Sequence, residues 1–217
     1  MLIKQDQGEK SEAARKEDPR ITRTRQLLLQ AFMALMNEKS FQSITVQDIT
    51  DRATVNRVTF YAHFQDKYAL LEYTIREMIR QRLQSQLPEG SDYCSGNLAR
   101  LIQTVCEFLD EMGRHCPPPY GQLEPLMEKQ IKAEIYEILW GWLAEKPPAG
   151  LPSRTSPEQA AMVASWAIYG AATQWLQQER REPVEAYVEG VLPLILSSLQ
   201  LTSASTAGSA GRTAEHN

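Results

Sequence analysis

The residues with the clearest chemical potential stand together in the stretch 45–71. Arg57, Val58 and Tyr61 occupy positions i, i+1 and i+4, and a helix would turn this stripe away from the face that carries Phe60. Such a stripe combines hydrogen-bond donors with an apolar contact, which suits the edges of DNA bases in a major groove. We interpret the stretch as a helix-turn-helix whose second helix docks in that groove.

Two short helices, tightly joined, must position this stripe. Thr45 is expected to open the first helix, with Asp48 as its capping-box partner three residues later. The link at Thr54 and Val55 is too short for a loop, so the second helix, capped by Asn56, must follow at a sharp angle. The spacing therefore predicts the joined helix pair itself.

Charge is divided along the chain. The formal net charge of −4 argues against a protein that coats nucleic acid through charge alone. Residues 19–67 nevertheless hold seven basic and four acidic side chains, whereas residues 68–217 hold twelve basic and eighteen acidic ones. Arg20, Arg23 and Arg25 lie in the first turns of a helix expected from residue 19 to about 39, where they oppose the helix dipole. A nearby phosphate would offset that cost; a solvated helix face is the alternative.

The rest of the chain alternates apolar helical periods with turn-forming segments. Capping and periodicity predict a long helix from residue 67 to about 87 and a helix at about 97–114. They also predict helices at about 121–143, with a possible break at Pro125, at 156–180 and at 183–199, where Pro193 should bend the helix. Gly170 inside the fourth of these helices would be explained by a close helix contact. The expected fold is all-α, with about nine helices.

The stretch around the two short helices resembles the TetR family (TetR/AcrR) of bacterial transcription regulators over about residues 20–71. The residues that carry the resemblance are, in order, Thr45-Val46, Ile49, Val55, Thr59-Phe60-Tyr61, His63-Phe64 and Lys67. The sequence departs from the family pattern at Thr50, where alanine is usual, and at Thr54, where glycine is usual. A left-handed turn residue is unfavourable for a β-branched side chain, so either the turn differs here or Thr54 is strained.

The resemblance implies a set of DNA contacts. Base contacts are expected from Gln47, Arg57, Val58 and Tyr61. Arg57 could donate to guanine O6 and N7, Val58 could touch a thymine methyl group, and Gln47 could pair with adenine. Phosphate contacts are expected from Thr45, Thr59, His63 and Lys67. The alternatives are local: caps, backbone hydrogen bonds, or packing of the stripe on the preceding helix.

Composition and the resemblance together predict four regions along the chain. A disordered arm (1–17) precedes the helix-turn-helix domain (18–66), and a helical effector-binding and dimerisation domain (67–200) is followed by a disordered tail (201–217). The expected ligand pocket is lined by Phe108, Met112, Tyr120, Met127, Trp140, Trp166, Tyr169 and Trp175. The last two helices are the expected dimer interface, through Ala164, Ala167, Ala171, Val191 and Ile195. Plain core packing is the alternative for each of these sets.

The function implied is a sequence-specific DNA-binding transcriptional regulator in the cytoplasm. It would bind a palindromic double-stranded operator as a homodimer, and an unknown small molecule would release it, since repression is the commoner mode in the family. No cofactor, metal or membrane is expected. The alternative is a DNA-binding protein of the same fold that is architectural or binds a partner protein, without a small-molecule inducer.

Other classes fit the sequence less well. A redox or metal sensor would have to use Cys94, Cys106, Cys116 and His115, whose spacing matches no closed zinc site. An enzyme is not expected, because the three histidines are far apart and no phosphate-binding glycine loop or nucleophile motif is present. The uncharged run 159–178 is long enough to span a bilayer but is rich in glutamine and small residues, which favours a buried helix.

Overall fold

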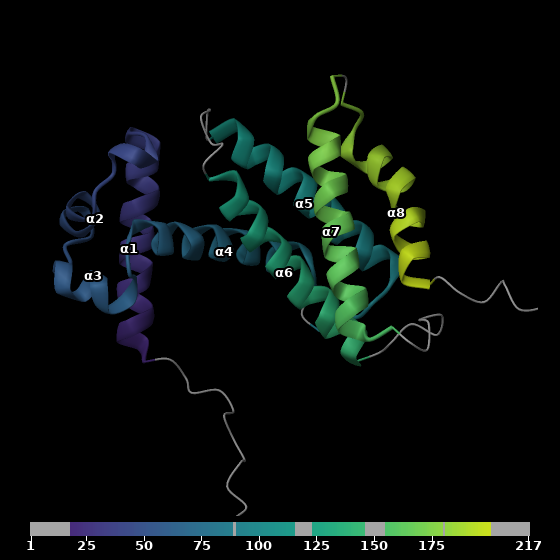
Figure 1. Ribbon diagram of the computed structural model, residues 1–217, viewed down its shortest axis with the longest axis horizontal. Helices are drawn as coiled ribbons and strands as arrows, with labels where there is room; N and C mark the ends of the chain where they lie inside the picture. The colour runs from purple at the N-terminus through teal and green to yellow at the C-terminus, as the bar shows by residue number, and fades with distance from the viewer. Residues whose placement is uncertain (1–17, 89, 116–122, 146–154, 180, 201–217) are drawn as a thin grey trace, which may run out of the picture. The chain divides into compact units, whose positions relative to one another are not determined.

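The computed structural model describes residues 18–88, 90–115, 123–145, 155–179 and 181–200. These residues form eight α-helices and one short 3-10 turn, and the described part contains no strand. The all-α prediction is confirmed, with eight described helices in place of about nine (Figure 1). The expected arm 1–17 and tail 201–217 lie outside the described residues. The chain divides into two compact units between Leu70 and Leu71.

The first unit is built on helix α1, Pro19–Glu38. The Asp18 side chain accepts a hydrogen bond from the Arg20 N–H at 2.9 Å, and Pro19 opens the helix, so the predicted start is confirmed. The buried face of α1 packs on η1 (Phe41–Ser43) and α2 (Val46–Ala53). It consists of Leu28, Ala31, Phe32 and Leu35. Helix α3 (Arg57–His63) follows α2, and the start of α4 (Lys67–Gln86) closes the unit.

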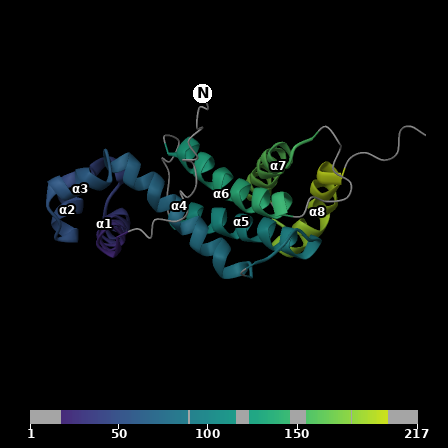
Figure 2. The ribbon, with the colours of Figure 1, turned by 90° about the horizontal axis from the view of Figure 1, so that it is seen from below.

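The second unit contains the remainder of α4 and four further helices (Figures 1 and 2). These are α5 (Ser95–His115), α6 (Glu124–Glu145), α7 (Pro157–Leu176) and α8 (Val184–Gln200). Helix α7 is central, since it packs closely on α5, α6 and α8. The Tyr187 hydroxyl donates to the Ala171 carbonyl at 2.7 Å and so attaches α8 to α7.

Two expectations about these helices need correction. Helix α6 shows no break at Pro125, because this proline is the second residue of the helix, where its missing N–H costs nothing. Helix α7 ends at Leu176, not near residue 180, and the following residues to Glu179 are not helical. The predicted start of α7 is confirmed, because Ser156 and Gln159 form a reciprocal capping box. None of the described helices combines the length and apolar character needed to cross a membrane.

Candidate nucleic-acid interface

The turn between α2 and α3 sets the geometry of the candidate interface. Thr54 adopts a left-handed conformation with φ 54° and ψ 44°, the strained alternative that the sequence left open. The Val55 N–H donates to the Thr50 carbonyl at 3.0 Å, which closes the end of α2 in the manner of a Schellman motif. Asn56 then caps α3 by accepting from the Val58 N–H at 2.8 Å. The chain thus turns within three residues and starts a new helix.

Helix α2 has a well-formed start. The Thr45 side chain accepts from the Asp48 N–H at 3.1 Å, and the Asp48 carboxylate accepts from the Thr45 N–H at 2.7 Å. Hydrogen bonds from Lys39 and then Thr45 hold the pKa of Asp48 well below its usual range. The carboxylate therefore stays ionised at neutral pH. The two reciprocal hydrogen bonds between Thr45 and Asp48 confirm the predicted capping box.

The stripe on α3 faces solvent while its opposite face is the core. Phe60 is fully buried, whereas Val58 is 76% exposed and Tyr61 is 51% exposed. Arg57 is exposed as well. Arg57, Val58 and Tyr61 therefore stand together on the solvent side of a seven-residue helix, where all three are accessible to a partner outside the chain. Packing of Val58 against the preceding helix, the local alternative, is not what the structure shows.

The remaining residues predicted to contact DNA differ in exposure and in the hydrogen bonds that their side chains already make. Gln47 is exposed on α2, and its amide donates to Asp51 at 2.6 Å, a bond that base pairing would have to exchange. Thr45 is exposed, and its hydroxyl is held by Asp48 at 2.7 Å. Thr59 and His63 are half-buried on α3. Their contacts with DNA remain predictions.

Lys67 has a structural role that the sequence did not suggest. Its ammonium donates to the carbonyls of Phe41, Gln42 and Ile44 at 3.0, 3.1 and 2.8 Å, and it lies 4.7 Å from the centre of the Phe41 ring. Burial lowers the pKa of this ammonium. The ammonium is directed at two carbonyls of η1 and at the carbonyl of Ile44, which follows it, so Lys67 positions the start of α4 against that turn. A phosphate contact from this side chain would have to break those bonds.

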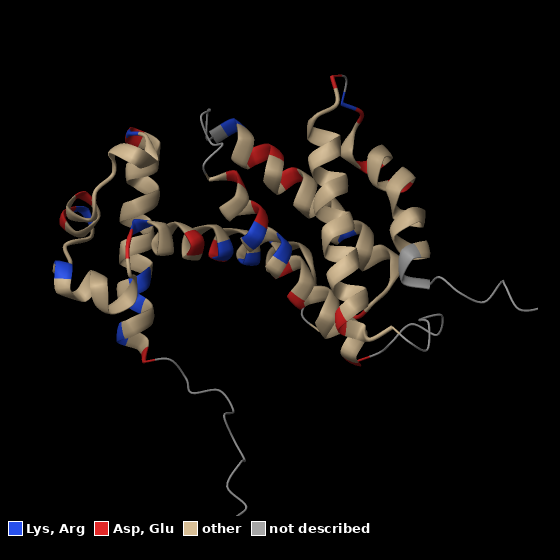
Figure 3. Cartoon of the chain, in the orientation of Figure 1, with Lys and Arg blue, Asp and Glu red and all other residues tan. Residues whose placement is uncertain are grey.

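Basic residues of the first unit lie on α1 and α3. Figure 3 shows them on the first turns of α1 and at the start of α3. Arg20 and Arg23 are exposed, and neither has an acidic partner among the described residues. By contrast, Arg52 donates two bonds to Glu38 at 2.8 and 2.7 Å. The cations available to phosphates therefore lie near the beginnings of α1 and α3.

The predicted ligand-pocket residues differ in burial. Phe108 and Trp175 are buried in the packed core of the second unit; Met112, Met127 and Tyr169 are half-buried. Trp140 and Trp166 are exposed, and Tyr120 lies outside the described residues. Trp166 lines an open hollow of about 500 Å³ between α6 and α7. The other described residues of this set line neither that hollow nor the groove between α4 and α6.

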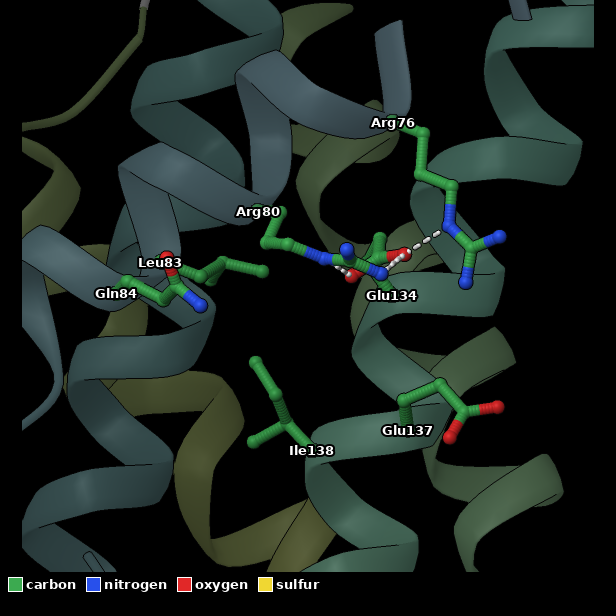
Figure 4. Close-up of a pocket in the computed structure, with 7 residues that line it drawn as sticks. All are labelled: Arg76, Arg80, Leu83, Gln84, Glu134, Glu137 and Ile138. Carbon is green, nitrogen blue, oxygen red and sulfur yellow. Dashed lines mark hydrogen bonds and ion pairs between the residues drawn. The ribbon is translucent and has the colours of Figure 1, made fainter. Parts of the chain in front are cut away.

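The groove between α4 and α6 was missed by the sequence reasoning. Figure 4 shows its charged end, where the buried Glu134 accepts from Arg76 at 2.6 Å and from Arg80 at 3.2 Å. This part has a volume of about 360 Å³, and an adjoining part of about 500 Å³ continues past the end of α4. Its polar lining comes from positions that a helical period assigns to solvent, so apolar periodicity alone could not reveal it.

The predicted dimer residues differ in how exposed they are. Ala164 is fully covered by its own subunit and Ile195 is 5% exposed, so neither offers surface to a second copy. Both side chains belong to the packed core of the subunit. Ala167, Ala171 and Val191 are half-buried. The exposed large apolar residues of these two helices are instead Met162, Val163, Trp166 and Leu194.

The cysteines do not form a site in the described residues. Cys106 is fully buried, and burial raises the pKa of its thiol to about 12, which makes it unreactive at neutral pH. Cys94 is exposed and accepts from the Asn97 N–H at 3.4 Å, near the start of α5. Cys116 and the side chain of His115 lie outside the description. Within the described part, no three His, Cys, Asp or Glu side chains gather in a metal-binding group.

Known proteins resemble this chain in the helix-turn-helix region and, more weakly, along most of its length. Residues 28–74 match the model for bacterial regulatory proteins of the tetR family. Over 192 residues the chain is 26% identical to the HTH-type transcriptional repressor DhaR of Mycobacterium sp. (strain GP1), which covers 82% of this chain and 96% of that protein. The matched domain contains α2, α3 and the exposed stripe.

Solved structures share the fold along most of the chain. A putative TetR-family transcriptional regulator from Syntrophomonas wolfei aligns with a TM-score of 0.52 and 16% identity, covering 85% of this chain and 99% of that one. FadR from Bacillus subtilis, in complex with stearoyl-CoA, aligns with a TM-score of 0.50 and 19% identity, covering 80% and 98%. These solved structures show the shared fold, and the family match places the helix-turn-helix region, residues 28–74, among the bacterial regulatory proteins of the tetR family.

Proposed function

We propose that this regulator is a repressor that binds a palindromic operator as a homodimer and is released from it by a small molecule. The observation that carries the proposal is the α3 stripe, which is exposed although Phe60 on the same helix is fully buried. The cytoplasm, where its operator would lie, is the proposed compartment. The similar DhaR is named as a repressor, which supports the sign of regulation.

Sequence readout is assigned to α3. Arg57 would donate to the edge of a guanine, Val58 would contact a thymine methyl group, and Tyr61 would add a further base contact. Gln47 on α2 would contact a base at the edge of the site after giving up its bond to Asp51. These contacts select sequence because each depends on groups that differ between base pairs.

Phosphate contacts would set the register of α3 on the duplex. Thr45, Thr59 and His63 are proposed for this role, together with the α4 start that Lys67 positions. The exposed Arg20 and Arg23 on α1 add cations that are well suited to phosphate. This group raises affinity for any DNA and makes binding depend on salt.

A homodimer is supported by the surface of α7 and α8. Val163 and Trp166 on α7 are 53% and 63% exposed, and Leu194 on α8 is 68% exposed. Gly170 and Gly190 lie in the interiors of the same helices, and a Cβ added at either would meet nothing within 4 Å in the subunit. A second copy seated on this face would cover the apolar side chains and use the space at the glycines.

Release by a ligand is proposed from the continuity of α4. The division between the two units falls inside this helix, after Leu70, so the helix that Lys67 anchors continues into the second unit. We keep residues 18–66 as the DNA-reading domain and 67–200 as the effector and dimerisation domain. The similar FadR of Bacillus subtilis was solved with stearoyl-CoA, which supports a ligand-responsive regulator without identifying the ligand here.

Substitution of the stripe tests this function. DNA that binds the wild-type protein is first selected from a random pool, and the affinity of each variant for it is then measured at one salt concentration. Arg57→Ala and Tyr61→Ala should each weaken binding about 10- to 100-fold, corresponding to ~1–3 kcal/mol per lost base contact, while the dimer remains intact. Asn37→Ala, an exposed change near the end of α1, serves as the control. Wild-type affinity in both stripe variants would refute the assignment.

A further inference from the structure

The groove between α4 and α6 has the dimensions of a small-molecule site. Its two parts, of about 360 and 500 Å³, share the lining residues Leu83, Gln84, Glu137 and Ile138 and so form one continuous hollow. Sites for small ligands usually have volumes of about 300–1,000 Å³. The groove lies entirely within the second unit, along the later part of α4.

The wider part of the groove has an apolar floor. Leu83 and Leu87 of α4 are 1% and 8% exposed, and Trp142 of α6 is 6% exposed. Ile138, one turn before Trp142, is half-buried beside them. These four side chains line the same hollow, so they would receive the apolar body of a ligand.

The charges of the groove are not equivalent. At the narrow end, both arginines are already engaged, since the two oxygens of Glu134 accept from Arg76 and Arg80 at 2.6–3.2 Å. Glu137 lines both parts of the groove, is exposed, and has no basic partner among the described residues. Figure 4 shows its carboxylate on a different turn of α6 from Glu134, away from the two guanidinium groups. Glu77 lies 3.5 Å from Arg80 and supplies a second carboxylate for the two arginines, so the carboxylates of Glu137 and Glu145 leave the groove with a net negative charge.

Gly141 supplies space in the same wall. It lies in the interior of α6, where glycine costs ~1 kcal/mol of helix stability relative to alanine. A Cβ added to Gly141 would meet no atom within 4 Å, so no neighbour in the described chain requires its absence. Because Gly141 lines the groove between Ile138 and Trp142, the missing side chain widens the hollow where the floor is apolar.

We propose that this groove binds an organic cation with an apolar body, whose positive group lies against Glu137 and whose body covers Leu83, Leu87, Ile138 and Trp142. The inference deepens the proposed function and rests on it in one respect, because the bound cation would be the releasing ligand. The floor accounts for the apolar body, the unpaired carboxylate selects the charge, and Gly141 provides the room.

Calorimetric titration of the full-length protein tests the site without DNA. The probes are decyltrimethylammonium and, as its anionic counterpart, decanoate, both below their micelle-forming concentrations. The cation should bind with a 1:1 stoichiometry per subunit and at least tenfold more tightly than the anion. Glu137→Gln should weaken cation binding about fivefold, the range of an exposed ion pair. Gly141→Leu should weaken it more than tenfold by filling the groove, and should raise the melting temperature.

The control is Glu179→Gln, which removes one exposed carboxylate beyond the end of α7 and should leave cation binding unchanged. Equal binding of cation and anion, or binding that neither Glu137→Gln nor Gly141→Leu alters, would overturn the site. The same probe is then added to the complex with selected DNA. Binding without release of DNA would leave the site standing and contradict the ligand-released repressor, so the two proposals fail separately.

Discussion

At the scale of single residues, Thr54 has the least favourable backbone in the first unit. Its φ of 54° lies in the left-handed region, where a Cβ and especially a β-branched side chain is disfavoured. The side chain is exposed and makes no hydrogen bond within the described residues, so none of its own contacts there offsets the strain. The fold accepts the cost because the bond from the Val55 N–H to the Thr50 carbonyl fixes the turn.

Thr54→Gly should therefore stabilise the protein by about 1 kcal/mol, since glycine enters the left-handed region without steric cost. The free energy of unfolding is measured by urea denaturation at fixed protein concentration. Thr54→Ala is the matched control, because it removes the β-branch but keeps the Cβ, and it should recover less. A glycine variant no more stable than wild type would show that the turn is unstrained.

At the scale of elements, α4 is attached to α6 through a buried carboxylate. The Glu134 side chain is 5% exposed, whereas its partners Arg76 and Arg80 are 45% and 40% exposed. Hydrogen bonding to Glu134 raises the pKa of Arg80. This difference in burial matters because the buried carboxylate, left without its arginines, would lack hydration, whereas the exposed guanidinium groups, left without the carboxylate, would stay hydrated. Removing the arginines should thus cost more than removing the carboxylate.

The double variant Arg76→Met and Arg80→Met should lower the free energy of unfolding by about 2–3 kcal/mol, a figure reduced for the solvent exposure of the arginines. Glu134→Met alone leaves two solvated guanidinium groups and should cost about 1 kcal/mol. The triple variant should recover most of the loss, as replacement of ion pairs by apolar groups often does. Denaturant unfolding of all variants gives the comparison, and equal losses in the two partial variants would contradict it.

The elements were largely predictable because their ends carry local signals. The capping boxes at Thr45 and Ser156 and the proline at position 19 depend only on neighbouring residues, so the starts of α2, α7 and α1 could be predicted. The exposed stripe followed from the helical period around Phe60. What depends on distant partners could not be predicted, such as the three carbonyls that bind Lys67 and the groove beside Glu134. Aromatic spacing could not separate pocket residues from core residues, because core and pocket walls have the same periodicity, so the predicted ligand contacts stay predictions.

At the scale of the whole molecule, operator binding is expected to depend on two copies. A single helix-turn-helix contacts a short site, and pairing two reading units multiplies the affinity. The candidate interface on α7 and α8 carries large apolar side chains that are well exposed in the single subunit, with Trp166 at 63% and Leu194 at 68%. A charge placed there should therefore prevent pairing without disturbing the subunit core.

Leu194→Glu should convert the protein to a monomer at micromolar concentration, because two glutamates would be buried against apolar surface across the interface. Size-exclusion chromatography with light scattering gives the mass, and affinity for the selected operator should fall by at least about 100-fold. Gln177→Glu, an exposed change just after α7, is the control and should remain dimeric. A dimeric Leu194→Glu protein would place the interface elsewhere.

The interior glycines Gly141, Gly170 and Gly190 should respond differently to selection for thermal stability and to selection for regulation. Each lies within a helix and has room for a side chain in the isolated subunit. A library screened only for thermal resistance should therefore accumulate alanine at these positions, gaining up to ~1 kcal/mol for each. The same library screened for a regulated reporter should keep glycine. The difference between the two surviving populations would map functional surface without knowledge of the operator or the ligand.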